Sequence, residues 1–305
     1  MTRTRKTGLR GAPGGLSLDR LRSFLSVVDA GGFAKSAPGD PSRQSQLSRQ
    51  VRDVERALGV SLLRREGRSV APTTAGLRLA TVVRDLADGL REVGTLPDEA
   101  PTEVTLASGD SVLRWLVIPS LGSALGPPPR ALVSLVASSN VVDDVMSGRA
   151  HLGVLRAQAI PAGITASACG TLGYSLFVPR RLTRAGDDLR ALLLRVPLAD
   201  VSGDREPLDR LAAALRLPLV ASLTCETFPQ AAGAVASGHF AALLPAVAAT
   251  ELPGAVATSF AVPALRLRSS RLTLLARTRT LETRPAAARL FAALGAALRQ
   301  RLRGP

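Results

Sequence analysis

The chain has 305 residues, 46% of them hydrophobic and only 3% aromatic, and it carries a formal charge of +15. This length fits two or three folding units, whose cores must be built from aliphatic side chains. With two cysteines, no CxxC pair and no run of about 18 apolar residues, the sequence excludes a disulfide scaffold and argues against a metal site and a membrane span.

The positive charge is concentrated near the N-terminus. The first 70 residues hold 14 Lys and Arg against 6 Asp and Glu, whereas the other 235 residues hold 25 against 18. Such a basic segment indicates a polyanionic partner, either nucleic acid or an anionic membrane surface. Residues 1–16 are basic, rich in glycine and proline and aperiodic. We expect them to be a disordered arm, not a secretory signal, and we expect the protein to be cytoplasmic.

Three helices are predicted within residues 17–73. Apolar residues recur at helical spacing over residues 18–28, and a short second helix is predicted over residues 33–37, before Pro38. The third helix is expected to be capped by Ser42 and to end at Gly59. Its apolar face comprises Leu47, Val51, Val54 and Leu58.

Two short β-segments are predicted after the third helix. Residues 60–63 and 69–71 are compatible with strands, and the basic run RREGR over residues 64–68 is the expected turn between them. Two strands around a basic turn, after three helices, are typical of a winged helix-turn-helix. The sequence therefore predicts this type of domain for residues 17–73.

A long helix is predicted over residues 74–97, with Thr73 as its cap. Its apolar residues repeat at intervals of seven in two series, which predicts a coiled-coil seam between two copies of the chain. The two series are Leu79, Leu86 and Val93, and Val83 and Leu90.

Strands and helices alternate from residue 101 to residue 305, which predicts α/β units with parallel sheets. Strands are expected over residues 103–107, 132–137, 151–155, 175–178, 218–222, 241–244 and 272–276. Helices are expected over residues 112–125, 141–147, 208–216, 230–237 and 285–303. The predicted fold class is α+β and α/β, with a winged helix-turn-helix, a long linker helix and an α/β region.

The third helix and the wing carry residue types that bind DNA. A helix-turn-helix lays its second helix in the major groove, where Arg and Gln make paired hydrogen bonds with guanine and adenine. Basic residues of a wing can reach phosphates or the minor groove. The candidate DNA-binding residues are Lys35, Arg43, Gln44, Gln46, Ser48, Arg49, Arg65 and Arg68. The alternative interpretation is a basic surface that is merely solvated.

Three stretches of this region resemble the LysR-type transcriptional regulators. They are LDRLRSFLSVVDAGGFAKSA from residue 18, RQSQLSRQVRDVERALGVSLLRREGR from residue 43 and APTTAG from residue 71. The chain departs from the family pattern at residues 38–41, where PGDP interrupts the second helix. It also departs at Arg43, where the family has serine, and at Leu63, where the family has an aromatic residue.

The resemblance implies a transcription regulator that binds double-stranded DNA as a homodimer or homotetramer joined through the linker helix. It also implies an effector domain over residues 101–305, with two α/β lobes similar to type 2 periplasmic binding proteins. We expect lobe I to comprise residues 101–157 and 259–305, and lobe II to comprise residues 158–258. A small-molecule effector is expected in a cleft between the lobes.

The candidate effector-binding residues follow predicted strands or precede predicted helices. Ligands of α/β lobes bind where the carboxyl ends of strands meet helix N-termini. The candidates are Ser108, Asp110, Ser111, Ser138, Asn140, Ser202, Thr224 and Thr227. Hydroxyl groups in such positions suit a small anion, whereas Asp110 opposes one, so the charge of the effector stays open. The alternative interpretation of these residues is helix capping.

No catalytic motif is found, so we expect neither an enzyme nor a cofactor. We interpret Cys169 and Cys225 as buried structural thiols, with a redox switch as the alternative, and we expect His151 and His239 to have core or surface roles. Two alternative functions stay open. One is a DNA binder with a degenerate effector site that acts constitutively, and the other is a binding protein or enzyme that uses the two-lobed domain.

Overall fold

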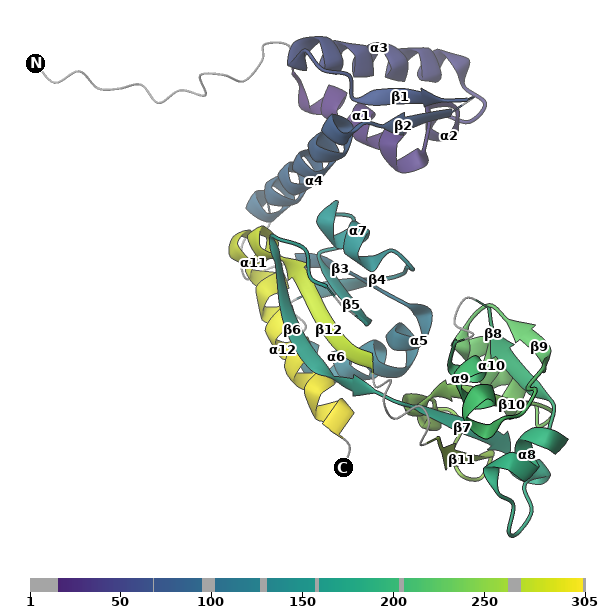
Figure 1. The fold of residues 1–305 in the computed structure, drawn as a ribbon. Helices are drawn as coiled ribbons and strands as arrows, with labels where there is room; N and C mark the ends of the chain where they lie inside the picture. The colour runs from purple at the N-terminus through teal and green to yellow at the C-terminus, as the bar shows by residue number, and fades with distance from the viewer. Residues whose placement is uncertain are drawn as a thin grey trace, which may run out of the picture. The chain divides into compact units, whose positions relative to one another are not determined.

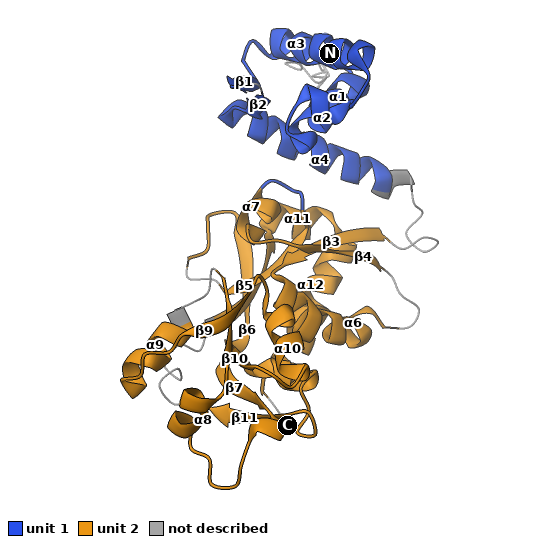
Figure 2. Ribbon diagram, turned by 90° about the vertical axis from the view of Figure 1, so that its right-hand side faces the viewer, with its two compact units in different colours: residues 1–97, 147–149 blue, residues 98–146, 150–305 orange. Residues whose placement is uncertain are grey.

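The computed structural model describes residues 16–67, 69–94, 102–126, 131–156, 159–202, 206–262 and 270–303. The chain divides into two compact units (Figure 2). Unit 1 comprises residues 1–97 and 147–149, and unit 2 comprises residues 98–146 and 150–305. The expected basic arm, apart from its last residue, the wing residue Arg68 and the side chain of Val93 lie outside the described residues. No helix of the described part is both long enough and apolar enough to cross a membrane.

Unit 1 begins with three helices that lie side by side (Figure 1). Their apolar faces meet in one core. These helices are α1 (Leu18–Ala30), α2 (Phe33–Ser36) and α3 (Pro41–Leu58). Phe24 and Val27 of α1 pack against Leu47, Val51 and Val54 of α3, which confirms the predicted apolar face. Since each of these side chains is at most 2% exposed, this face of α3 is fully buried and the opposite side of the helix faces solvent.

The start of α3 differs from the prediction. Asp40, not Ser42, is the cap, because its carboxylate accepts the backbone N–H of Arg43 at 2.8 Å. Pro41 is the first residue of the helix, a position that needs no N–H and suits the fixed φ of proline. The PGDP segment at residues 38–41 therefore contains the cap and the first residue of α3. Gly59 ends the helix with φ of 68°, as predicted.

The wing is a two-stranded antiparallel ribbon, in which the strand predicted over residues 69–71 is present and the first strand differs from the prediction. It consists of β1 (Leu63–Glu66) and β2 (Ser69–Pro72), with Leu63 opposite Pro72 and Glu66 opposite Ser69. The residues expected to form the basic turn lie largely within β1, and the strand expected over residues 60–63 is wrong. Only Leu63 of β1 is partly buried, and the three residues after it are exposed and charged, so β1 carried no alternating pattern that could locate it.

The long helix α4 (Thr74–Gly94) follows the wing directly. The Thr73 hydroxyl accepts the backbone N–H of Gly76 at 3.1 Å, which confirms the predicted cap. Leu79 packs against the core of its own unit, so it is not part of an open seam. Leu86 and Leu90 are 42% and 48% exposed, and Val82, outside the predicted series, is 57% exposed. The exposed apolar stripe of α4 therefore consists of Val82, Leu86 and Leu90.

Unit 2 contains two five-stranded sheets, each the centre of one lobe. The first sheet has the order β4-β3-β5-β12-β6, and the second has the order β11-β7-β10-β8-β9. The strands of the first lobe are β3 (Thr102–Ser108), β4 (Ala131–Ala137), β5 (Leu152–Arg156), β6 (Ile164–Leu172) and β12 (Ser270–Arg277). Those of the second lobe are β7 (Tyr174–Pro179), β8 (Leu198–Val201), β9 (Ala221–Cys225), β10 (Ala241–Pro245) and β11 (Ala257–Ala261).

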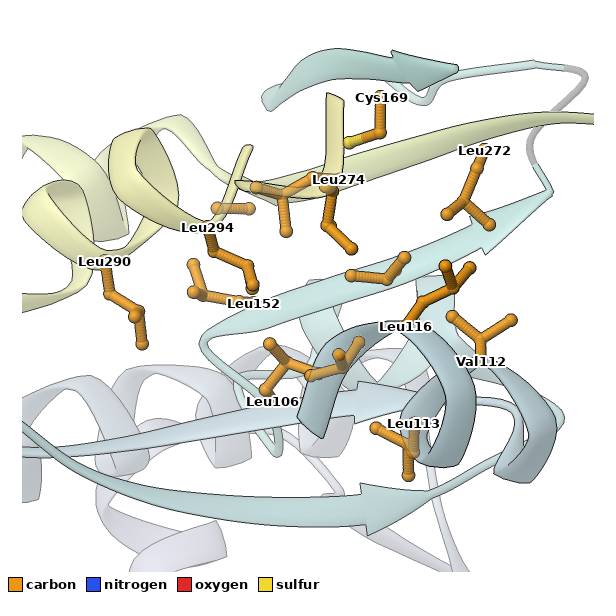
Figure 3. Packing of buried hydrophobic residues seen from close by; sticks show 14 of the residues in the cluster. Leu106, Val112, Leu113, Leu116, Leu152, Cys169, Leu272, Leu274, Leu290 and Leu294 are labelled. Carbon is orange, nitrogen blue, oxygen red and sulfur yellow. The ribbon is translucent and has the colours of Figure 1, made fainter. Parts of the chain in front are cut away.

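Helices cover these sheets. They are α5 (Asp110–Val112), a π-helical segment η1 (Leu113–Val117), α6 (Ile118–Leu125), α7 (Val141–Met146), α8 (Leu189–Arg195), α9 (Glu206–Leu215), α10 (Phe228–Ala236), α11 (Thr278–Thr283) and α12 (Pro285–Arg303). Short 3₁₀ segments follow β7 and β10, namely η2 (Arg180–Leu182) and η3 (Ala246–Thr250). In the first lobe, Leu106, Leu152 and Leu274 pack under Leu290 and Leu294 of α12 (Figure 3). Neighbouring residues of the same strands point to α7 on the other face.

Two expectations for unit 2 are corrected. The sheets are mixed, because β12 runs antiparallel to β5 and β6, and β7 runs antiparallel to β10 and β11. The lobe boundaries are also wrong, since residues 164–172 form a strand of the first sheet and residues 257–261 a strand of the second. The boundary correction comes from β6 and β11, which were not predicted, whereas the strand directions depend on pairing between segments far apart in the sequence, which local patterns do not record.

Candidate functional site

The solvent side of α3 carries a basic row. Ser45, Arg49, Arg52 and Arg56 are exposed and recur in steps of four, three and four, so they share one side of the helix, opposite the buried Leu47. Of the predicted DNA-binding residues, Lys35, Arg43, Gln46 and Arg49 are exposed and Ser48 is half-buried. The sequence reasoning missed Ser45, Arg52 and Arg56, which the spacing from Arg49 could have found.

Gln44 has a structural role that the sequence did not indicate. Its Nε2 donates a hydrogen bond to the Ala37 carbonyl at 2.9 Å, which ties α3 to the end of α2. The half-buried amide therefore has a partner within the domain, and a base contact of Gln44 stays a prediction. Other predicted residues pair loosely on the surface, since Arg43 Nη1 donates to Gln46 Oε1 at 3.2 Å and Arg52 Nη2 donates to Ser48 Oγ at 3.0 Å.

The acidic residues around α3 are engaged by local contacts. Asp40 caps the helix, and Asp53 pairs with Arg20 at 3.4 Å and with Arg56 at 2.9 Å. Glu55 accepts backbone N–H groups of the segment before the wing. By contrast, the structure gives Lys35 and Arg49 no ion-pair partner among the described residues. The exposed side of α3 therefore keeps a positive potential that suits a polyanion.

The wing adds a second basic element. Arg64 Nη2 lies 2.6 Å from Glu66 Oε1, so this arginine is paired within the strand. Arg65 is exposed in β1 opposite Val70, and no partner for its guanidinium is found in the described part of the wing. Among the described residues of the wing, Arg65 is therefore the cation whose guanidinium is available to a phosphate. Its contact with DNA stays a prediction.

The candidate effector residues of the first lobe gather at the carboxyl ends of β3 and β4. The backbone N–H of Ser138 donates to the Ser108 carbonyl at 2.9 Å, which joins the two strand ends. Ser108 is fully buried, and its hydroxyl donates to the Val154 carbonyl at 2.5 Å. The Ser138 hydroxyl donates to Asp144 and accepts the Asn140 N–H. These two hydroxyls serve the fold, whereas Asp110 and Asn140 are exposed and Ser111 is half-buried.

The candidates of the second lobe gather in the same way at the ends of β8 and β9. The backbone N–H of Ser202 donates to the Cys225 carbonyl at 2.8 Å. Thr224 lies within β9 and not after it, which corrects its predicted place. Thr227 caps α10, because its hydroxyl accepts the Gln230 N–H at 3.3 Å. Ser202 and Thr224 are exposed.

The two lobes share packed contacts that the sequence did not indicate. Trp115, the only tryptophan, belongs to the chain segment of the first lobe but packs in a core of the second lobe, beside Phe177 and Leu252. Arg114 forms an ion pair with Glu251 of the second lobe. Helix α5, which follows β3, lies against α10, which follows β9. These contacts bring the carboxyl ends of the two sheets to the same region of unit 2. The sequence signal that could have pointed to these contacts was Trp115, a single tryptophan within a predicted helix.

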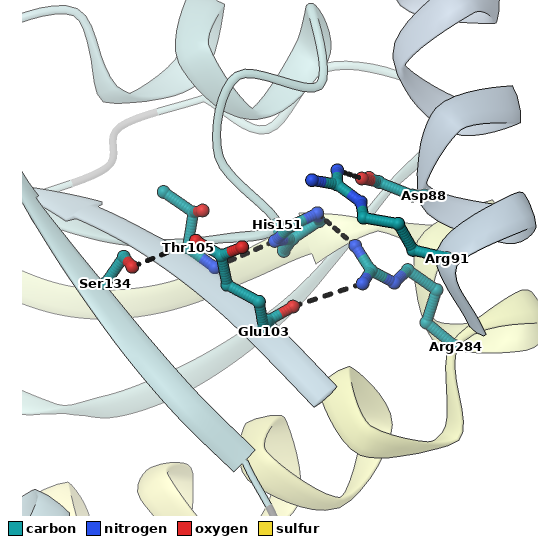
Figure 4. Close-up of polar contacts among 7 residues, drawn as sticks. All are labelled: Asp88, Arg91, Glu103, Thr105, Ser134, His151 and Arg284. Carbon is teal, nitrogen blue, oxygen red and sulfur yellow. Dashed lines mark hydrogen bonds and ion pairs between the residues drawn. The ribbon is translucent and has the colours of Figure 1, made fainter. Parts of the chain in front are cut away.

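His151 is part of a buried hydrogen-bond network in the first lobe. The buried His151 accepts the Thr105 N–H on Nδ1 at 2.8 Å, and its Nε2 contacts the Arg284 guanidinium (Figure 4). Arg284 Nη2 also donates to the Glu103 carbonyl at 3.1 Å. This supports the core role expected for His151, and His239 is exposed, as a surface role requires.

The two thiols lie in separate cores. Cys169 packs in the first lobe, with Leu272 and Leu274, and Cys225 packs in the second lobe, with Ala199. Burial raises the pKa of both thiols above the ordinary value, and the nearby Asp200 carboxylate adds to the rise at Cys225. The interpretation of both residues as buried thiols is confirmed.

Both units match known families. Residues 18–77 match the model of bacterial regulatory helix-turn-helix proteins of the lysR family, and residues 97–299 match the LysR substrate binding domain. A putative transcriptional regulator of Pseudomonas aeruginosa is 34% identical over 109 residues, which are 34% of this chain and 36% of that protein. The regulator AbaB of Streptomyces antibioticus is 29% identical over 182 residues, 57% of this chain and 60% of its own. The matches thus span between about a third and three fifths of these two relatives.

Solved structures share the fold. ArgP from Mycobacterium tuberculosis has a TM-score of 0.63 at 19% identity, covering 93% of this chain and 97% of its own. LysG from Corynebacterium glutamicum with bound effector Arg has a TM-score of 0.57 at 18% identity, covering 93% and 99%. Full-length CbnR complexed with its target DNA has a TM-score of 0.50 at 21% identity, covering 93% and 100%. At these identities the likeness establishes the arrangement of the chain.

Proposed function

The chain belongs to the LysR family of bacterial transcriptional regulators, and from this premise we propose that it is a sequence-specific DNA-binding regulator whose activity is controlled by a small-molecule effector. The observation that carries the proposal is the basic side of α3, on which Arg49 and Arg52 face solvent while the neighbouring acids are held in local contacts. A regulator of transcription acts on the chromosome, so we place it in the bacterial cytoplasm.

We assign DNA contacts to both basic elements of unit 1. In the proposal, α3 enters the major groove with Arg49 toward base edges, and the wing places Arg65 at a phosphate. The remaining assigned residues are Lys35, Arg43, Gln46, Ser48 and Arg52, with Arg68 as a prediction outside the described residues. The fold shared with CbnR, whose structure contains its target DNA, supports this docking.

We assign the effector to the region where the strand ends of the two lobes meet. Asp110, Ser111 and Asn140 of the first lobe and Ser202 and Thr224 of the second keep solvent-accessible polar side chains there. Ser108, Ser138 and Thr227 position the surrounding backbone, since their hydroxyls are bonded within the fold. LysG, which has the same arrangement of the chain, carries a bound effector Arg, so a small polar ligand is compatible with this fold.

We propose that two copies join through α4. Val82, Leu86 and Leu90 expose apolar surface on this helix, and burying such a stripe against a second copy removes it from water. The proposed organisation is a DNA-binding domain over residues 17–73, a dimerisation helix over residues 74–97 and an effector domain over residues 101–305. Assembly of dimers into tetramers is the further state proposed for the family.

Fluorescence anisotropy tests the DNA-binding proposal. The probe is a labelled duplex from the intergenic region upstream of the gene for this protein, titrated at several salt concentrations. Replacing Arg49 by alanine is expected to weaken binding, whereas Arg289→Ala, which removes the same charge from an exposed site on α12, is expected to leave binding unchanged. Affinity weaker than about micromolar together with no salt dependence contradicts the proposal, because phosphate contacts release counterions.

One observation favours a second function. Three of the eight predicted effector residues have their hydroxyl groups bonded within the fold, as expected of a regulator whose effector site is degenerate. A thermal-shift screen of metabolites separates the two functions, because a ligand that binds the folded state raises the unfolding temperature. Stabilisation by any metabolite supports effector control, and no stabilisation across the screen supports constitutive DNA binding.

A further inference from the structure

We propose that Glu55 is a positioning residue of the wing, whose carboxylate sets where Arg65 meets DNA. The inference rests on the proposed DNA-binding function. Glu55 lies in the last turn of α3, and its Oε1 accepts the backbone N–H of Leu62 at 2.7 Å and that of Leu63 at 3.2 Å. One side-chain oxygen of the DNA-reading helix therefore holds the two residues at which the wing begins.

These two N–H groups need an acceptor that the wing does not supply. Leu62 precedes β1 and lies outside the ladder, and its side chain is 1% exposed. A buried N–H without an acceptor destabilises the fold, whereas a carboxylate gives a stronger bond than a neutral acceptor does. Glu55 thus fixes the backbone at the point where it turns from α3 into β1.

The opposite side of Leu62 is held by the start of α4. The Thr73 N–H donates to the Leu62 carbonyl at 2.9 Å, and the Thr73 hydroxyl donates to the Ser61 carbonyl at 2.8 Å. A Cβ at Gly76 would lie 2.1 Å from the Leu62 oxygen, so only glycine allows this approach. Leu62 directly precedes β1, and Thr73, which bonds to Leu62, directly follows β2. The two ends of the wing are therefore joined at Leu62.

The other acid in this part of α3 is engaged differently. Asp53 pairs with Arg20 and Arg56, whereas the contacts of Glu55 go to the backbone before the wing. Removing Asp53 changes surface charge, but removing Glu55 takes the acceptor away from the N–H groups of Leu62 and Leu63, so that only the contacts from the start of α4 still hold the base of the ribbon. The ribbon carries Arg65 on β1, two residues beyond Leu63, so a change in the direction of β1 moves the guanidinium away from its phosphate.

A double-mutant cycle tests the inference by anisotropy with the intergenic duplex. Arg65→Ala in the wild-type chain is expected to weaken binding about tenfold per protomer near 0.1 M salt and to reduce the salt slope by about one per protomer, because each copy of the dimer loses one phosphate contact. Glu55→Ala is expected to weaken binding to a similar extent. In the Glu55→Ala background, Arg65→Ala is expected to cost less than about twofold further, because the wing no longer places the residue.

Matched variants separate positioning from general destabilisation. Glu55→Gln keeps an acceptor at Oε1 and is expected to restore the full tenfold effect of Arg65→Ala. Glu55→Asp keeps the charge but is one methylene short of the two N–H groups, so it is expected to behave as Glu55→Ala and replaces that variant if alanine unfolds the domain. Arg49→Ala is expected to cost the same factor in every background, since α3 stays in place.

The outcomes distinguish this inference from the proposed function. A tenfold effect of Arg65→Ala that persists in Glu55→Ala or Glu55→Asp overturns the positioning role. If Arg65→Ala has no effect in the wild-type chain while Arg49→Ala weakens binding, the inference about Glu55 fails and the DNA-binding function stands. If neither variant changes affinity, the DNA-binding proposal fails as well.

Discussion

Replacement of Trp115 tests whether the two lobes of unit 2 share a core. The side chain is 1% exposed among residues of the second lobe, although it comes from the segment after β3. Replacing a buried tryptophan by alanine removes its contacts and leaves a cavity, at a cost of about 3–5 kcal/mol. We therefore expect Trp115→Ala to lower the opening free energy of the second-lobe sheet by about this amount.

The ion pair between the lobes gives a matched comparison. The side chains of Arg114 and Glu251 are 57% and 32% exposed, and such pairs contribute about 0–1 kcal/mol. Arg114→Ala is thus expected to cost less than about 1 kcal/mol. The free-energy cost of Trp115→Phe is expected to lie between those of Arg114→Ala and Trp115→Ala. The variant loses side-chain volume, but it also removes the buried indole Nε1–H, which has no hydrogen-bond acceptor in the described part of the protein.

Hydrogen–deuterium exchange of β10 peptides measures these free energies within the second lobe, without requiring the whole chain to unfold in one step. Loss of protection in Trp115→Ala by several kcal/mol, against a small change in Arg114→Ala, is the expected result. Equal, small effects of the two variants would refute the shared core. The same comparison bears on the effector mechanism, because wide separation of the lobes would have to expose this tryptophan.

Three further variants probe unit 1 and the thiols. Leu90→Glu is expected to convert the dimer to monomer in analytical ultracentrifugation, whereas Arg78→Glu, at another exposed position of α4, is expected to leave the dimer intact; a dimeric Leu90→Glu protein contradicts the role of the stripe. Asp40→Ala is expected to destabilise unit 1 by about 0.5–2 kcal/mol in thermal unfolding and Asp40→Asn by much less, since asparagine also caps. The free energy of unfolding of unit 2 is expected to fall as pH rises above the ordinary thiol pKa, because the raised pKa keeps Cys169 protonated in the folded state while the unfolded thiol ionises. Cys169→Ala is expected to flatten this decline. A pH profile that this variant leaves unchanged would show that Cys169 does not contribute to the decline.

The sequence predicted unit 1 well where side chains are buried at a local period. The apolar face of α3 and its end at Gly59 follow from helical spacing and from the φ that glycine allows, and both are present. The second wing strand was predicted, but the first was misplaced because Arg64 and Arg65, which were taken for the turn, are exposed residues of β1. The capping role of Asp40 was missed because proline at the first helical position resembles a turn when only the sequence is read.

Unit 2 was predicted less completely because its lobes exchange strands. The order of helices and strands is visible locally, but β6 pairs with β12, about a hundred residues later in the chain, and this pairing decides which lobe it joins. Trp115 illustrates the same limit at the level of one side chain. Its apolar neighbours come from the second lobe, so no spacing around residue 115 indicates where it packs.

The arrangement of charge in unit 1 gives a quantitative expectation for DNA binding. The acids of α3 and its cap, Asp40, Asp53 and Glu55, have local partners in a helix end, in arginines and in backbone N–H groups, so they do not pair with the cations assigned to DNA. With Arg49 assigned to base edges, the described basic residues assigned to phosphates are Lys35, Arg43, Arg52 and Arg65. If each holds one phosphate, a dimer makes about eight contacts, and the slope of log affinity against log salt is about −7. A measured slope near −7 supports docking through both α3 and the wing. A slope near −2 would leave most of these cations away from phosphates, and the assignment of the basic side of α3 to the DNA backbone would then be wrong.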